Sequence, residues 1–338
     1  MRALVILFLA FEVCFAGCSN STKNDESSPE IINTDTIESD SFQRKKIGFV
    51  VHPNSPKVKA ILASRFTSLE QFNKVVKIEY YKGWRKVDTA SIHNNAVELT
   101  YTSNGNDLIC RLKAGLSQDD ITKALEGGFN ERMNLLTISP FAVRNRAELN
   151  KISRLARRRP ALFGEGDVAF FDLAETSVFN INTPDLAFYS PKDSSEKGFL
   201  NTFNHITAQT FISTFHSIYM AEFVGDVHER HNMPELTTGM FSKEQLTDLD
   251  NNPIDNYVDV INNRIGQDLG YYLKSKYGIT SETNWTNELL CDYLNDIQSY
   301  YCWSFGIGMK PYKPEDELIK RFADKINVVA KGVPFQDI

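Results

Sequence analysis

Residues 201–231 form a long segment with helical periodicity, and this segment limits the kind of hydrophobic core that the chain can form. Apolar side chains recur along the segment at the spacing of one broad helix face. They include Phe203, Phe211, Phe215, Ile218 and Phe223. A face that broad has to be covered by other elements on several sides. The segment therefore predicts one long buried helix, or two helices with a break near Gly225, inside a helical core.

The same period continues through most of the chain after residue 140. We expect further helices at 144–159, 255–276, 284–301 and 315–330, with a loop at 304–314. The first of these places Leu149, Ile152 and Leu155 on one stripe, and its many basic residues are interpreted as a solvated face rather than a phosphate-binding or membrane-binding surface. Residues 141–338 therefore predict a large, mainly α-helical domain.

Residues 46–140 show a different pattern. Short segments rich in β-branched and aromatic residues predict about four strands, at 47–51, 75–81, 96–102 and 107–113. The "SNGN" between the last two is a hairpin turn signal. Helices are expected at 55–66 and 117–129, the second with Ser117 as its N-cap and Gly127-Gly128 as its stop signal. The fold class is therefore α+β: a small N-terminal α+β domain followed by the larger helical domain.

The first 17 residues have the layout of a secretory signal, with Arg2 followed by an apolar run. The run is shorter than the roughly 20 residues that a membrane-spanning helix needs. It ends in Phe15-Ala16-Gly17-Cys18, which resembles a bacterial lipobox, so we expect lipidation at Cys18; an ordinary cleaved signal is the alternative. Residues 18–45 are polar and predict a disordered tether. The expected location is the cell envelope, lipid-anchored at the outer membrane of a Gram-negative bacterium.

The residues that follow the anchor and the net charge of the chain limit the kinds of binding partner to be expected. "KNDE" at 23–26 resembles the signal that sends some Bacteroidetes-type lipoproteins to the cell surface. The net charge is −6, and it stays −6 when the signal leaves with one Arg and one Glu. This mild acidity argues against general nucleic-acid binding. We therefore expect the membrane as one partner, through the lipid on Cys18, and a surface protein or a small molecule as another.

Three cysteines remain beyond the signal and the lipidation site, Cys110, Cys291 and Cys302. No CxxC or Cys/His spacing typical of a metal site is present. On one continuous helix Cys291 and Cys302 would lie about 16 Å apart, too far for a disulfide. We expect free, mostly buried thiols, with a pair between these two as the alternative if the chain turns between them.

The expected helix at 255–276 carries unusual polarity in "VDVINNRIG", residues 258–266. Asparagine and glycine each reduce helix propensity, so packing alone does not explain them. Asp259, Asn262, Asn263 and Gly266 lie at i, i+3, i+4 and i+7 and share one face. Their side chains could hold a hard metal ion, orient a water molecule or lock two helices together by hydrogen bonds. Gly266 would let a neighbouring helix or a ligand approach the backbone.

A second candidate set is "GDVHERH", residues 225–231. His228 and His231 are three residues apart, so the HExxH zinc motif is absent. His228 and Glu229 point about 100° apart on a helix and would act together only if the helix ends there. For His228, as for His216, the simpler interpretation is a buried histidine with satisfied hydrogen bonds.

The segment "DLDNNPID" places Asp248, Asp250 and Asn252 at the spacing that opens a calcium loop. Pro253 stands where such a loop needs glycine, and Asp259 replaces its closing glutamate. A calcium loop of the EF-hand type is therefore disfavoured.

The order of "NHITAQ", "GDVHE" and "DVINNRIG" resembles the bacterial family known as domain of unknown function 6973, which also occurs at the C-termini of polymorphic toxins and secreted proteins. The resemblance covers about residues 150–277. It differs at Asn204, where the family has Arg, and at Ala208, where it has Trp. The shared positions that it implies are His205, His228, Glu229, Asp259, Asn262, Asn263 and Gly266. It implies positions and assigns no reaction.

Two interpretations of these residues stay open. In one, three helices bring His205, His228, Glu229, Asp259, Asn262 and Asn263 to one pocket of a hydrolase-like enzyme, with or without zinc or another divalent ion, acting on a phosphodiester, a lipid or cell-wall material. In the other, the same residues form a buried hydrogen-bonded network in a protein that binds a partner. A cleft that exposes the His and Asp side chains to solvent favours the enzyme, and full burial favours the network.

Overall fold

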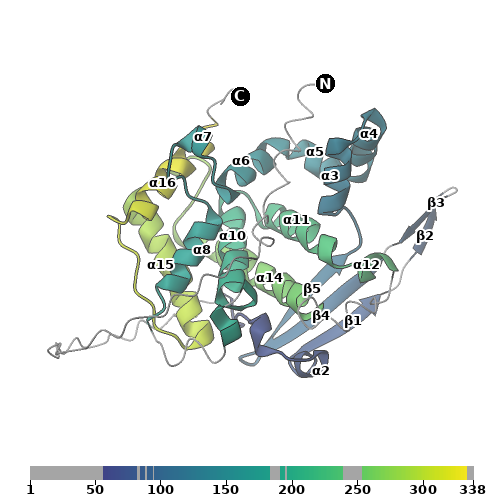
Figure 1. Cartoon of the computed structure of the whole chain (residues 1–338), viewed down its shortest axis with the longest axis horizontal. Coiled ribbons are helices and arrows are strands. Elements are labelled where there is room, and N and C mark those ends of the chain that lie inside the picture. Colours follow the sequence, from purple (N-terminus) through teal and green to yellow (C-terminus); the bar gives the residue numbers. More distant parts are fainter. Residues whose placement is uncertain are drawn as a thin grey trace, which may run out of the picture.

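The computed structural model describes residues 56–81, 84–87, 90–93, 95–182, 191–194, 196–238 and 253–332. The expected signal segment, the lipidation site Cys18, the tether and the strand at 47–51 lie outside these residues. So does the segment 248–252 of the disfavoured calcium loop. Within the described residues the chain is mostly helical with a small antiparallel sheet, as Figure 1 shows.

The sheet contains three strands in the order β1 (Val76–Tyr81), β4 (Ala96–Ser103), β5 (Asn106–Lys113). The predicted turn between β4 and β5 is confirmed, because Asn104 and Gly105 both have positive φ, as a two-residue hairpin requires. A separate hairpin of β2 (Trp84–Val87) and β3 (Ala90–His93) connects β1 to β4 and was not predicted. Buried Leu99, Cys110 and Leu112 turn one face of the sheet toward the helices.

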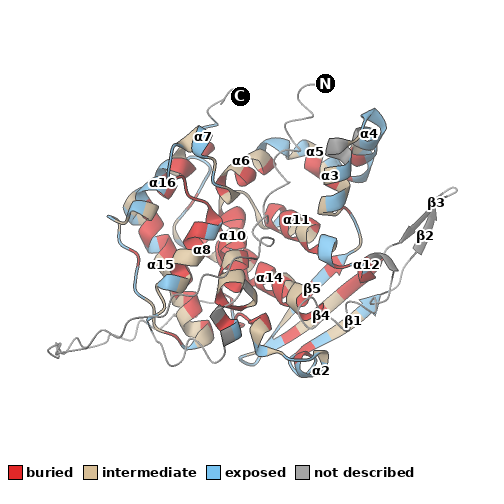
Figure 2. Cartoon of the chain, in the orientation of Figure 1, coloured by how far each residue is buried: buried red, intermediate tan, exposed pale blue. Residues whose placement is uncertain are grey.

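The helices form a bundle beside the sheet. After β5 come α3 (Gln118–Glu126), α4 (Phe129–Ile138), α5 (Pro140–Arg144), α6 (Arg146–Ala156), α7 (Pro160–Phe163) and α8 (Phe170–Phe179). They are followed by α10 (Asn201–Phe215), α11 (Ile218–Glu229), α12 (Glu235–Thr238), α14 (Pro253–Lys276), α15 (Asn287–Phe305) and α16 (Glu317–Ala330). Figure 2 shows buried residues concentrated on α10 and α14 at the centre of the molecule. None of the described helices combines the length and the apolar character that crossing a bilayer requires.

Helices α10 and α14 pack most closely, at two glycines. A Cβ atom placed on Gly266 would lie 2.7 Å from the carbonyl oxygen of Ile206 and 2.8 Å from Cβ of Gln209. A Cβ atom placed on Gly270, one turn later, would lie closer still to the carbonyl oxygen of Thr210. Hydroxyl groups of α10 donate to the backbone there, with Thr210 Oγ1 bonded to the carbonyl of Gly266 at 3.1 Å. The approach that Gly266 was expected to allow is therefore made by a helix.

Two predicted elements are wrong in detail. The long segment 201–231 is broken at His216 and Ser217, not near Gly225, because Ser217 leaves the helical conformation and caps α11 by accepting from the Met220 amide. Gly225 lies inside α11. The helix expected at 55–66 is absent from its described part apart from the short 3-10 turn Ala63–Arg65, because Leu62 is extended and the Ile61 backbone bonds to a side chain of α14.

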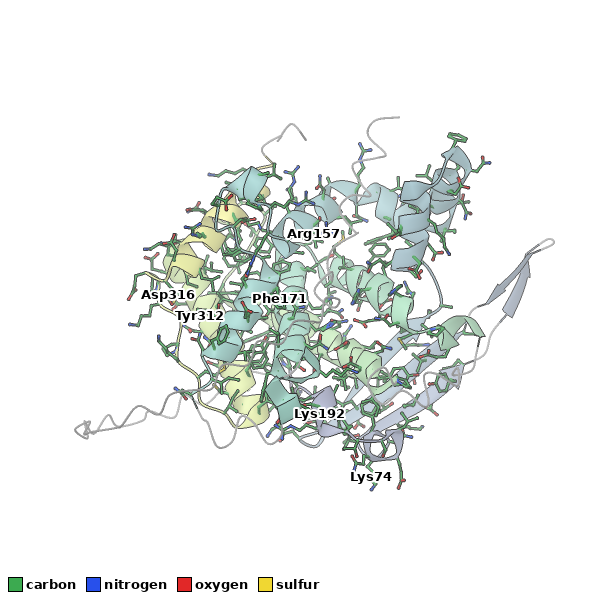
Figure 3. The ribbon with its side chains drawn as sticks, viewed as in Figure 1. Lys74, Arg157, Phe171, Lys192, Tyr312 and Asp316 are labelled. Atoms are coloured by element: carbon green, nitrogen blue, oxygen red, sulfur yellow. The ribbon has the colours of Figure 1, made fainter. Side chains whose placement is uncertain are left out.

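Other predictions are confirmed. Ser117 caps α3 in a capping box with Asp120, and α6 buries its predicted stripe of Leu149, Ile152 and Leu155. Among the described residues the cysteines form no disulfide; Cys110 and Cys291 are buried and Cys302 is half-buried. Cys291 and Cys302 both lie on α15, which keeps them apart. The loop after α15 is held to α8 by Tyr312, labelled in Figure 3, whose hydroxyl donates to the carbonyl of Leu173 at 2.8 Å.

Candidate functional site

Three helices bring predicted polar residues together in the interior. Helix α10 supplies His205, the last turn of α11 supplies Glu229, and α14 supplies Asp259 and Asn263. We call these four residues the central cluster. Each is at most 7% exposed. The helical spacing in "VDVINNRIG" therefore identified a real polar meeting point in the core.

The imidazole of His205 is the centre of this cluster. Its Nδ1 lies 2.9 Å from Asn263 Oδ1 and 3.6 Å from Glu229 Oε1, and its Nε2 lies 3.4 Å from Asp259 Oδ2. Asn263 Nδ2 donates to Glu229 Oε1 at 2.7 Å. Asn201, one turn before His205, donates to Asp259 Oδ1 at 2.9 Å. The cluster is thus a chain of contacts from Asp259 through His205 and Asn263 to Glu229.

Burial shifts the protonation of every ionisable member. It lowers the pKa of His205, although the hydrogen bond to Asn263 acts in the opposite direction. It raises the pKa of Asp259 to about 7, against the lowering effect of the Asn201 hydrogen bond. Burial and the neighbouring Asp259 raise the pKa of Glu229 well above its usual range. The two carboxyl groups therefore hold protons at a pH where exposed carboxyls have lost them.

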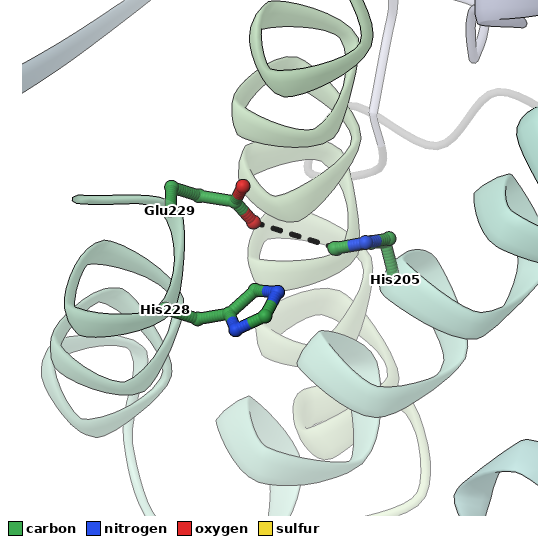
Figure 4. A group of neighbouring side chains, drawn as sticks. All are labelled: His205, His228 and Glu229. Carbon is green, nitrogen blue, oxygen red and sulfur yellow. Dashed lines mark ion pairs between the residues drawn. The ribbon is translucent and has the colours of Figure 1, made fainter. Parts of the chain in front are cut away.

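His228 approaches the cluster from the same turn as Glu229. The backbone stays helical at Glu229 and at Arg230, yet the side chains of His228 and Glu229 both extend toward His205, as Figure 4 shows. His205, His228 and Glu229 each offer one atom suited to a metal ion, all within 4.8 Å of one another. The rings of His205 and His228 have centroids 6.1 Å apart. His228 Nδ1 lies 3.3 Å from Gln118 Oε1 of α3.

Asn262 points to a different neighbour. Its carboxamide accepts from the Ile61 amide at 3.2 Å and donates to the Ile61 carbonyl at 2.8 Å. It is fully buried and holds the extended segment before Ala63 against α14. The structure therefore separates Asn262 from the other site residues and gives it the contacts of an anchoring residue.

Two further groups near the cluster were not predicted. Asn201 and Asp255 each lie four residues before a cluster member on its own helix, so helical spacing could have found them. Asp255 Oδ1 is buried and has no hydrogen-bond partner within the described part of the chain. Burial, with Asp259 nearby, raises the pKa of Asp255 to about 6. His231 lies outside the cluster and pairs with Asp119 at the surface.

A cleft of about 340 Å³ reaches the cluster from outside, between β5, α11 and α14. Glu229 and Asn263 line it, and His205 and Asp259 do not. Arg264 and Glu222 also line it, and Arg264 forms ion pairs with Glu222 at 2.6 Å and with Asp268 at 3.2 Å. Solvent-sized molecules therefore reach one side of the cluster, while the His–Asp contact lies within the protein.

Comparison of the chain with protein-family models, with curated proteins and with solved structures found no match. The resemblance to domain of unknown function 6973 therefore stays a prediction that rests on the residues named above.

Proposed function

We propose that this chain is a lipid-anchored protein of the cell envelope that binds a small polar molecule in the cleft beside the central cluster. The cluster is proposed to act as a hydrogen-bonded network that fixes the floor of this cleft. Membership of the family that the sequence resembles is part of the proposal, as is the division into an α+β unit at 46–140, with a fourth strand at 47–51, and a helical unit at 141–338.

One observation carries the proposal: Glu229 and Asn263 belong both to the buried network and to the wall of the cleft. The cleft volume falls in the range of small-molecule sites. His205 and Asp259 are buried behind this wall, at 4% and 7% exposure. Such burial favours a supporting network over an open active site.

The network is tested by Asn263→Ala, with Asn256→Ala as the matched control on the same helix. Loss of Asn263 removes the hydrogen bonds to His205 Nδ1 and to Glu229 Oε1, at about 1–3 kcal/mol for each buried group left unpaired. Asn256 is half-buried, and its side chain donates to the Asn232 carbonyl at 2.9 Å and lies outside the central cluster. We expect urea unfolding to show a clearly lower free energy for Asn263→Ala alone. Equal stability of both variants would contradict the network.

Binding is tested by a crystallographic screen of small polar fragments. We expect fragments to lie against Glu229 and Asn263, because both residues line the cleft. Fragments found only at other surfaces would contradict the binding site.

Lipid anchoring is tested by labelling cells with an alkyne palmitate analogue, which should label the wild type and not Cys18→Ser. Label that persists in Cys18→Ser would refute the anchor.

A hydrolase is the second candidate, favoured by the contact of the cleft with Glu229. A carboxyl group whose pKa is raised by burial can hold a proton for general acid catalysis. The proposed substrates are phosphodiesters, lipids or cell-wall fragments. Hydrolysis of any of these that disappears in Glu229→Gln would establish the enzyme, and activity unchanged in that variant would exclude this role for Glu229.

A further inference from the structure

Both ring nitrogens of His205 face oxygen acceptors. Nδ1 faces Asn263 Oδ1 and Glu229 Oε1, and Nε2 faces Asp259 Oδ2. A neutral imidazole carries one N–H, so the other nitrogen faces an oxygen with its lone pair unless the facing carboxyl group carries a proton. Reversing the Asn263 amide would not help, because its Nδ2 already donates to Glu229 at 2.7 Å. The cluster is therefore short of one positive charge, which either a proton or a metal ion can supply.

The surrounding charges point the same way. Asp255 lies one turn before Asp259 on α14, and its Oδ1 has no hydrogen-bond partner among the described residues. In the described part of the chain no Lys or Arg forms an ion pair with Glu229 or Asp259. Lys197 is near enough to lower the pKa of Asp259 but forms no such pair. Ionised carboxylates buried without a cation are costly, so these groups either keep their protons or gain from a positive ion beside them.

We infer that His205 Nδ1, His228 Nε2 and a carboxylate oxygen of Glu229 bind one divalent transition-metal ion. The candidate atoms of these residues lie within 4.8 Å of one another, so small side-chain movements bring them to the usual ligand distances of about 2.0–2.2 Å. Two imidazoles and one carboxylate suit zinc and its neighbours, whereas calcium and magnesium prefer oxygen ligands throughout. The ion would occupy the same cluster on which the proposed function rests, and it adds a ligand to that function.

The other nitrogen of each histidine supplies independent support. A metal on His205 Nδ1 leaves the Nε2–H to donate to Asp259, which Asn201 holds in place. A metal on His228 Nε2 leaves the Nδ1–H to donate to Gln118 Oε1. Metal-binding histidines almost always donate their second N–H to a carboxylate, a carbonyl or water, which fixes the ring. Both rings thus have the partner that a ligand histidine needs.

The cleft gives this ion an open side. Glu229 lines both the cleft and the site, so water can enter at a coordination position that the three protein ligands do not fill. An ion bound in this way lowers the pKa of its water. Metal binding would therefore strengthen the hydrolase candidate, although binding alone does not establish a reaction.

The test is zinc binding by the full chain in detergent, after chelator treatment, measured by isothermal titration calorimetry. We expect one ion per chain. His228→Gln and Glu229→Gln should each weaken binding by more than about 100-fold, and Asp259→Asn by about 10- to 100-fold. His231→Gln is the control, since His231 is exposed and pairs with Asp119, and it should bind like the wild type. Cobalt(II) should give visible absorption bands that His228→Gln loses.

His228 is only half-buried, so His228→Gln is the variant best able to keep the fold, which circular dichroism checks. Zinc bound equally well by His228→Gln and the wild type would overturn the site. So would a folded wild type that takes up no zinc. In that case a destabilised Asn263→Ala would still support the network, because the two measurements are separate. Zinc binding together with an undisturbed Asn263→Ala would support the metal site and contradict the network.

Discussion

The close contact of α10 and α14 gives a prediction whose sign distinguishes the structure from helix propensity alone. Replacing glycine by alanine inside a helix normally stabilises it by about 1 kcal/mol. At Gly266 the added methyl would lie 2.7 Å from the Ile206 carbonyl, closer than any real Cβ contact allows. At Gly270 the obstacle is also backbone, the Thr210 carbonyl, and it lies closer. A backbone oxygen cannot swing away as a side chain can, so the helices must separate.

The magnitude follows from the two opposing effects. Overpacking a closely packed interface costs about 1–3 kcal/mol and occasionally more. Separation also stretches the bonds from Thr210 to the Gly266 carbonyl and from Thr214 to the Gly270 carbonyl. We expect Gly266→Ala to lose about 1–2 kcal/mol after the gain in propensity, and Gly270→Ala to lose more.

Gly225 supplies the matched control, because it also lies within a helix at the centre of the molecule. Its added methyl would meet the amide end of Gln209 at 3.0 Å, which is the far end of a side chain. Gly225→Ala should therefore remain within about 0.5 kcal/mol of the wild type. Urea unfolding followed by circular dichroism measures all three variants. Unchanged or increased stability of Gly266→Ala and Gly270→Ala would refute the close contact.

Two further variants test single contacts. Asn262→Ala leaves the buried amide and carbonyl of Ile61 unpaired and should lower the free energy of unfolding by about 1–3 kcal/mol for each group, with zinc affinity unchanged. Burial lowers the pKa of His216 from 6.5 to about 4, so the unfolded chain takes up this proton first. Stability should therefore fall between pH 6.5 and pH 4, by at most about 3 kcal/mol, and His216→Asn should flatten this slope in thermal melts. An unchanged slope in His216→Asn, or an undisturbed Asn262→Ala, would contradict the contact concerned.

Elements whose signals are local were predictable. The hairpin turn at Asn104-Gly105 needs two residues that tolerate positive φ, and the capping box at Ser117 needs residues three positions apart. The α14 helix was expected at 255–276 and spans Pro253–Lys276. In each case the residues that determine the structure are neighbours along the chain, so a single sequence contains the whole signal.

Elements that depend on distant partners were not predictable. The segment before Ala63 has a helical spacing of apolar residues, yet it is extended because Asn262, 201 residues away, binds the Ile61 backbone. From the sequence, Ser217 could equally have lain inside one long helix. In the structure it is extended, with φ −162°, and caps α11. The same holds for the site. Helical spacing placed Asp259, Asn262 and Asn263 on one face, but it did not predict that Asn262 would bind the Ile61 backbone instead of the central cluster.

The polarity of α14 is explained by how completely its neighbours surround it. Asp259 meets α10, Asn263 joins α10 to the end of α11, Asn262 holds the segment before Ala63, and Gly266 admits the α10 backbone. Losing one partner leaves another buried polar group unpaired, whereas an apolar replacement of both partners can be nearly neutral. Helix packing alone could therefore have used apolar residues throughout at little loss. What apolar residues cannot supply is two histidines and a carboxylate beside a cleft, with an oxygen behind each ring. Packing does not require these ionisable side chains, and this is the physical reason for regarding the cluster as a ligand site as well as a network.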